Sequence, residues 1–61
     1  MKVIFYFVVT LGGSVISLRR EYELNENSTL TELAKMRTCA KEQVGREYKT
    51  SLVEYKYMDV L

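Results

Sequence analysis

Two strand-like runs joined at Gly12 and Gly13 constrain the fold of this chain more than any other feature. In residues 2–11, apolar side chains occupy both sets of alternate positions, so this run is apolar on both faces. A strand of this kind must be covered on both sides to leave water. The 61 residues supply little more than one cover. We therefore expect one small domain, residues 1–61, that depends on a partner.

The Gly-Gly loop favours a tight hairpin and fixes the register of residues 2–11 against residues 14–24. Cross-strand partners lie on the same face of a sheet. The register collects large apolar residues on one face, which we predict to be the core: Val3, Phe5, Phe7, Val9, Leu11, Ile16, Leu18 and Tyr22. Arg20 falls on this face opposite Phe5, and we expect its side chain to extend along the ring to water.

A capping box at Thr29 and Glu32 predicts a helix over residues 29–49. Residues at helical spacing form one apolar stripe: Leu30, Leu33, Met36, Ala40, Val44 and Tyr48. Gly45 either lies inside this helix or just past its end, and the phase of Tyr48 favours the longer helix. Residues 52–61 then alternate, which predicts a third strand with Val53, Tyr55 and Tyr57 on one side.

The order strand, strand, helix, strand predicts an α+β fold. We expect a three-stranded sheet in the order 2-1-3, with the first strand central and antiparallel to both neighbours and the helix on one face. This order resembles the opening of a β-grasp (ubiquitin-like) domain in topology, with no shared sequence motif.

The second face of the sheet then lies uncovered, with Ile4, Tyr6, Val8 and Val15 on it. Such a patch is larger than monomers commonly expose. We predict that these four residues form the interface of a homodimer or higher oligomer. Alternatively, the two edge strands extend the sheet across a partner protein.

The composition excludes several classes of function. Nine basic against eight acidic residues give a net charge of +1, which argues against a strongly basic nucleic-acid module and against an acidic DNA mimic. Histidine is absent and Cys39 is the only cysteine, so we expect no disulfide, no metal site, no cofactor and no catalytic residue. Because Gly12-Gly13 precedes a strand and not a helix, it is no phosphate loop. The lone thiol favours a reducing compartment, and we expect a cytoplasmic protein.

Residues 1–17 loosely resemble a secretory signal, but their register with the next strand favours the hairpin. The apolar run of residues 3–11 is also too short to span a bilayer, which needs about 20 residues. We therefore expect no contact with a membrane.

The basic residues leave a second function open. Arg19 shares the second sheet face with Tyr6, and either Tyr55 or Tyr57 extends this group. Arginine beside exposed aromatic rings is typical of surfaces that bind single-stranded nucleic acid. On the helix, Arg37 lies on the apolar stripe and either extends along the core to water or forms, with Lys41, a basic strip for an acidic partner.

These observations favour a small non-enzymatic protein-interaction module, a homo-oligomer that acts as an adaptor or inhibitor. A chain of this size is typical of adaptors and of phage or mobile-element proteins that block a host enzyme, an expectation that rests on size and on no particular residue. The alternative is a weak nucleic-acid-binding protein that uses Arg19, Tyr6 and the basic helix residues.

Overall fold

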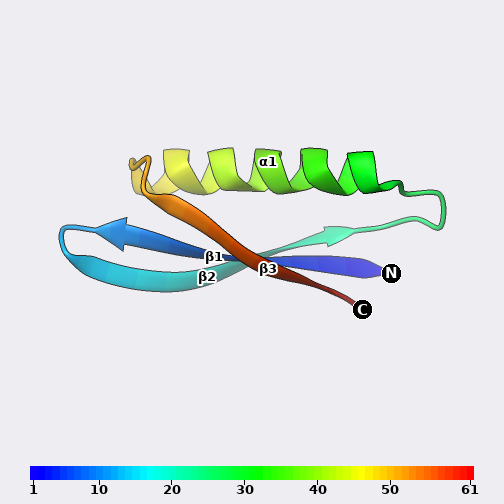
Figure 1. The fold of residues 1–61 in the computed structure, drawn as a ribbon, viewed down its shortest axis with the longest axis horizontal. Coiled ribbons are helices and arrows are strands. Elements are labelled where there is room, and N and C mark those ends of the chain that lie inside the picture. Colours follow the sequence, from blue (N-terminus) through cyan, green and yellow to red (C-terminus); the bar gives the residue numbers. More distant parts are fainter.

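A computed structural model describes residues 1–61 as a three-stranded sheet with one helix along one of its faces (Figure 1). The elements in chain order are β1 (Lys2–Leu11), β2 (Ser14–Glu23), α1 (Leu30–Tyr48) and β3 (Val53–Val60). The sheet order is β2-β1-β3, and β1 is antiparallel to both neighbours. This confirms the α+β fold and the strand order predicted from the sequence. Each element ends within one residue of its predicted range.

The β1–β2 hairpin has the register that the Gly-Gly loop predicts. Phe7 pairs with Leu18, and Leu11 pairs with Ser14. Gly12 and Gly13 both have positive φ, at 51° and 84°, as a type I′ turn requires. A residue with a Cβ in this left-handed region costs roughly 1–2 kcal/mol, so the two glycines hold the turn that sets the whole register.

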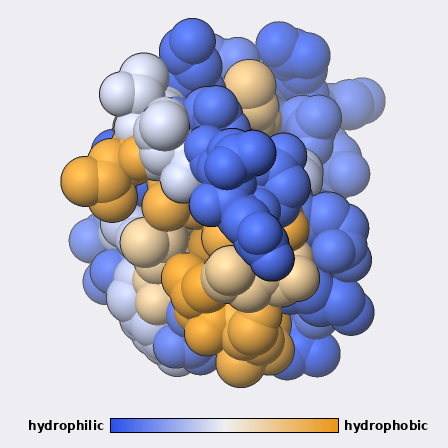
Figure 2. Space-filling model, turned by 90° about the vertical axis from the view of Figure 1, so that its right-hand side faces the viewer, coloured by the Kyte–Doolittle hydropathy of each residue, from blue (hydrophilic) through white to orange (hydrophobic).

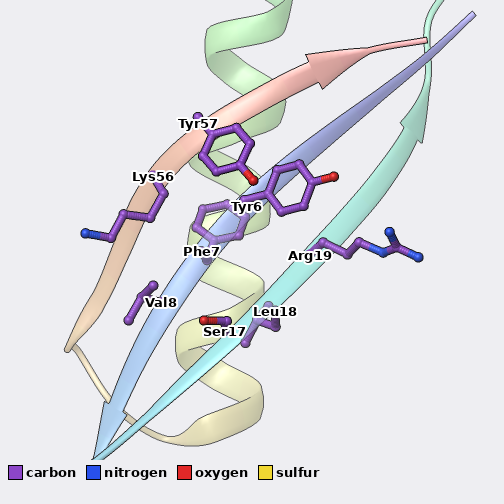
Figure 3. A pocket seen from close by; sticks show the side chains of 8 residues that line it. All are labelled: Tyr6, Phe7, Val8, Ser17, Leu18, Arg19, Lys56 and Tyr57. Carbon is purple, nitrogen blue, oxygen red and sulfur yellow. The ribbon is translucent and has the colours of Figure 1, made fainter.

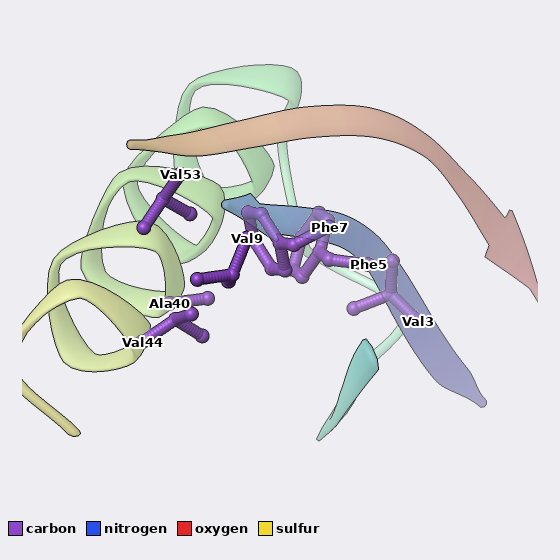
Figure 4. Close-up of a cluster of buried hydrophobic side chains, with 7 residues drawn as sticks. All are labelled: Val3, Phe5, Phe7, Val9, Ala40, Val44 and Val53. Carbon is purple, nitrogen blue, oxygen red and sulfur yellow. The ribbon is translucent and has the colours of Figure 1, made fainter. Parts of the chain in front are cut away.

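The core lies between the helix-facing side of the sheet and α1 (Figure 4). Seven buried side chains form it: Val3, Phe5, Phe7, Val9, Ala40, Val44 and Val53. Around them pack half-buried residues that include Leu11, Leu18, Tyr22, Leu33, Met36, Tyr48 and Tyr55. Four of the five inward residues of β1 belong to the core and the fifth, Leu11, packs against it, which identifies β1 as the strand that organises the fold.

Two residues predicted for the core are exposed, and the position of α1 explains both. The helix packs mainly on β1 and β3. Ile16 on β2 lies outside this main helix–sheet contact and stays exposed. Leu30 is the first residue of α1 and lies at the rim of the helix–sheet contact, where its side chain is 82% exposed.

Polar contacts join α1 to β2 where apolar contacts are sparse. The guanidinium of Arg20 forms an ion pair with Glu47 near the end of α1. The hydroxyl of Tyr22 donates a hydrogen bond of 3.3 Å to Oε1 of Gln43. Arg20 thus extends to the protein surface, where its side chain, 31% exposed, meets the carboxylate of Glu47 on the helix.

The ends of α1 follow from local chemistry. Oγ1 of Thr29 accepts a hydrogen bond of 3.2 Å from the backbone N–H of Glu32, as the capping box predicts. At the other end Lys49 adopts a left-handed conformation with φ of 53°, and the N–H of Thr50 donates to the carbonyl of Gly45 at 3.0 Å. This pattern is a Schellman motif, and it places Gly45 inside the helix. A Cβ on Gly45 would lie 3.0 Å from the carbonyl oxygen of Thr50, which explains the glycine.

We predict that Lys49→Gly stabilises the protein by about 1 kcal/mol, because glycine adopts the left-handed conformation without the steric cost of a Cβ. Urea unfolding monitored by circular dichroism measures the change. The matched variant Gly45→Ala lowers the free energy of unfolding despite the better helix propensity of alanine, since its Cβ crowds Thr50. A Lys49→Gly variant less stable than the parent would contradict this account of the helix end.

Candidate interaction surface

The sheet face turned away from α1 is not covered by any element of the chain (Figure 1). We call it the open face. Its members follow from the strand registers: Ile4, Tyr6, Val8 and Thr10 of β1; Val15, Ser17, Arg19 and Glu21 of β2; Glu54, Tyr57 and Asp59 of β3. The surface therefore combines an apolar and aromatic centre from β1 with charged residues from the two edge strands.

A β-bulge in β3 determines which tyrosine reaches the open face. Tyr57 pairs with Tyr6, whereas Tyr55 pairs with Phe7, so Lys56 is an extra residue between two regular pairs. Tyr55 therefore points toward the helix and Tyr57 points to the open face. The prediction that Val53, Tyr55 and Tyr57 share one side is wrong for Tyr57, because simple alternation does not reveal a bulge.

Tyr6 and Tyr57 stack on each other at the centre of the open face, with ring centroids 4.4 Å apart and an angle of 16° between the ring planes. The Tyr57 side chain remains 55% exposed. A shallow hollow of about 390 Å³ lies beside the pair, flanked by Arg19 from β2 and Lys56 from β3 (Figure 3). Figure 3 shows these two long side chains extending outward on opposite sides of the tyrosines. The arrangement offers aromatic surface at its centre and cationic side chains at its margins, of which Lys56 is paired with Glu54 at 3.2 Å.

The four residues predicted as an interface differ in how much they are exposed. Tyr6 and Val8 are half-buried and lie together at the hollow. Val15 is 67% exposed but lies near the hairpin turn, opposite Thr10. Ile4 is only 4% exposed, so the expectation that it stands uncovered is wrong.

Neighbours on the same face explain the burial of Ile4. It pairs with Glu21 on one side and Asp59 on the other, and it lies one pleat from the stacked tyrosines. The side chains of Glu21, Asp59 and the tyrosine pair therefore flank Ile4 on all sides of the face. Ile4 forms the floor of the open face, and Tyr6 and Tyr57 form its contact surface.

Arg37 and Lys41 do not join Arg19 and Tyr6. They lie on the helix side of the sheet, in a groove between α1 and β3. The guanidinium carbon of Arg37 lies 5.0 Å from the ring centroid of Tyr55, a cation–π geometry. The structure thus separates the predicted basic residues into two surfaces on opposite sides of the sheet.

A further apolar surface lies at the end of the molecule that carries both termini and the start of α1 (Figure 2). The exposed apolar residues of these segments are Met1, Leu30, Met58, Val60 and Leu61. Sequence reasoning did not identify this surface. The signal for it was the sequence that follows the bulge, where Met58, Val60 and the terminal Leu61 outnumber the single charge of Asp59.

The chemistry of the remaining side chains is limited. Cys39 is an exposed free thiol on α1. No cluster of three or more histidine, cysteine or acidic side chains is arranged to hold a metal ion. The buried residues are all hydrophobic, so no charged or polar side chain is held in a low-dielectric site. No helix is long and apolar enough to cross a membrane.

No family model matches this chain, and neither the curated proteins nor the solved structures give a significant match.

We predict different stability effects for the two neighbouring tyrosines of β3. Tyr55→Ala lowers the free energy of unfolding by about 2 kcal/mol, because the Tyr55 ring packs against Phe5 and Phe7. Tyr57→Ala lowers it by about 1 kcal/mol or less, since it removes an exposed ring stacked on Tyr6. Urea unfolding at low protein concentration, where self-association does not contribute, measures both. Equal effects, or a larger effect at Tyr57, would contradict the bulge at Lys56.

Proposed function

We propose that this chain is a non-enzymatic protein-interaction module that acts as a homodimer through the open face. The observation that carries the proposal is the exposed Tyr6–Tyr57 stack on a sheet face that has no cover within the chain. Tyrosines are enriched at protein interfaces because their rings bury much area while their hydroxyls stay hydrogen-bonded. A second copy supplies the same rings and covers both faces at once.

The charges of the open face support a second copy as its occupant. They form two adjacent rows across the sheet. In one row, Ile4 lies between Glu21 and Asp59, so this row is acidic. In the next, Arg19 lies beside the stacked tyrosines and makes this row basic, while Lys56, which follows on β3, is paired with Glu54 at 3.2 Å. Such a surface is complementary to a second copy of itself when the acidic row of one chain lies over the basic row of the other.

The two rows select the direction of the strands in the dimer. A two-fold axis across the strands and between the rows makes the two β1 strands antiparallel. It then places Glu21 of one chain over Arg19 of the partner, and Ile4 over Tyr6. An axis along the strands would place Glu21 over Asp59, which brings two carboxylates together. We therefore propose the antiparallel arrangement.

The size of the open face predicts a weak dimer. Three strands of 8–10 residues give a face of about 400 Å², from about 3.3 Å per residue and about 4.8 Å between strands. Stable interfaces bury about 800 Å² on each partner, and smaller ones belong to weak, transient complexes. The dimer we propose forms in the micromolar range, which leaves the face available to exchange for another protein.

We further propose that the module works in the cytoplasm as an adaptor or inhibitor. Its exposed free Cys39 supports a reducing compartment. The adaptor or inhibitor role, and an origin in a phage or mobile element, are supported by the size of the chain alone.

The antiparallel dimer predicts rescue by a charge swap. Arg19→Glu places a carboxylate against Glu21 of the partner and weakens dimerisation at least tenfold. Adding Glu21→Arg restores the opposite charges across the two-fold axis and recovers the affinity to within about threefold of the parent. Sedimentation equilibrium of the three proteins at low salt measures the dissociation constants, because exposed ion pairs are screened at high salt.

Two further variants distinguish the location of the interface from the orientation of the strands within it. Tyr6→Glu abolishes dimerisation, while Thr31→Glu, an equal charge change on exposed helix surface, leaves it unchanged. Failure of the double swap to recover affinity, with Tyr6→Glu still monomeric, would contradict the antiparallel register. A parent protein that stays monomeric at hundreds of micromolar would contradict the dimer itself.

Single-stranded nucleic acid is a second candidate ligand for the open face. The observation in its favour is the pair Tyr6 and Tyr57 with Arg19 and Lys56 beside it, since bases stack on rings while cations hold phosphates. The carboxylates of Glu21 and Asp59 next to the pair oppose it. Titration with a labelled oligonucleotide at two salt concentrations tests this candidate. Absence of binding at low salt would exclude it.

A further inference from the structure

A groove of about 870 Å³ runs between α1 and β3, on the side of the sheet opposite the open face. We call it the seam groove. Arg37, Lys41 and Arg46 of α1 line it, together with a single acidic residue, Glu42. Glu42 lies 3.7 Å from Arg46 and is already partnered by it. The groove therefore carries an excess of positive charge in a protein whose net charge is only +1.

The opposite wall of the groove is the free edge of β3. At one end of the β1–β3 pairing, the backbones of Lys2 and Leu61 donate hydrogen bonds to each other. At the other end, the N–H of Thr10 donates to the carbonyl of Leu52. Because bonded and outward residues alternate in an antiparallel ladder, Val53 and Tyr55 direct their N–H and C=O groups away from β1. These same two residues line the seam groove. An extended segment placed there meets unpaired backbone groups on one side and cations on the other.

The groove continues into an apolar hollow toward the start of the helix. This hollow, of about 140 Å³, is lined by Leu30, Leu33 and Met58 among others. Arg37 and Tyr55 line both the hollow and the groove, so the two form one continuous surface. Leu30 and Met58 are apolar side chains that remain exposed. They place aliphatic surface next to the basic seam groove.

We propose that the seam groove binds an extended, acidic segment of a partner protein, which adds as a short strand to the edge of β3. Side chains at alternate positions of the segment face the helix, because successive residues of a strand point to opposite sides. Acidic residues at these positions meet Arg37, Lys41 and Arg46, and an aliphatic residue of the segment occupies the hollow. The bulge at Lys56 interrupts the edge, so the paired part of the segment is only about three or four residues long.

The edge of β2 lacks these features. Its helix-facing residues Arg20 and Tyr22 are bonded to Glu47 and Gln43, so its contacts to α1 are already made. No basic groove lines that edge. The two edges of the sheet are therefore not equivalent, and only the β3 edge combines unpaired backbone groups with a charged wall.

Fluorescence anisotropy with short labelled peptides tests the proposal. The probe is a hexapeptide with glutamate at two alternate positions, valine between them and leucine at one end, made in both sequence orders. We expect one order to bind at low salt and to weaken as salt is added. Lys41→Glu weakens binding at least tenfold. Lys35→Glu, the same charge change at an exposed helix position outside the groove, changes it less than twofold.

Two chemical controls separate strand addition from simple attraction of charge. Peptides with lysine in place of glutamate do not bind. Peptides with N-methyl groups on the amides that face β3 keep their charge but lose at least tenfold in affinity, because they cannot donate to the edge. Equal binding of the N-methylated peptide, or no binding of either sequence order, would overturn the proposal. The proposal would also be overturned if an oligonucleotide bound more tightly than the peptide and Lys41→Glu weakened its binding by the same factor.

The test is independent of the dimer. The seam groove and the open face lie on opposite sides of the sheet, so Tyr6→Glu leaves peptide binding unchanged. A monomeric protein that binds the acidic peptide would support the seam groove while refuting the dimer. A dimeric protein that fails to bind the acidic peptide would support the dimer and refute the seam-groove proposal.

Discussion

The apolar character of β1 on both of its faces is the constraint on which the rest of this structure depends. One set of alternate residues, from Val3 to Val9, supplies four of the seven core side chains under α1. The other set includes Ile4, Tyr6 and Val8, and the chain has no second layer to place over it. A single helix can satisfy one face of a sheet, so the strand that stabilises the fold also creates an apolar surface that needs a cover.

The chain partly solves this problem with its own side chains. Ile4 is buried because its neighbours on both strands and the tyrosine pair surround it. The bulge at Lys56 makes this possible, since it turns Tyr57 to the open face and leaves Tyr55 in contact with Phe5 and Phe7. One inserted residue thus divides the aromatic residues of β3 between the core and the candidate interface.

Much of this architecture could be predicted from the sequence, because it follows from short-range rules. Gly12-Gly13 fixes the hairpin register, Thr29 marks the start of the helix, and the apolar content of residues 2–11 requires a central strand. The exposure of Ile16 was not predictable in this way. It depends on where α1 sits across the sheet, and tertiary contacts decide that position.

The candidate surfaces were predictable only in part, for related reasons. Tyr6 and Arg19 share a face as the hairpin register requires, but the bulge that adds Tyr57 leaves no signal in an alternating sequence. The sequence predicted the basic wall of the seam groove, because Arg37 and Lys41 lie one helical turn apart. It did not predict the β3 wall, because the outward direction of the Val53 and Tyr55 backbone groups depends on the hydrogen bonds between β3 and β1.

The central claim is that a second copy of the chain covers the open face. Isotope-filtered NOE spectroscopy on a mixture of labelled and unlabelled protein tests it most directly, at a concentration of several hundred micromolar. The account predicts contacts between the exposed Tyr57 ring of one chain and the Asp59 side chain of another, which the proposed two-fold axis places over each other. A spectrum with only intramolecular contacts for these residues would contradict it.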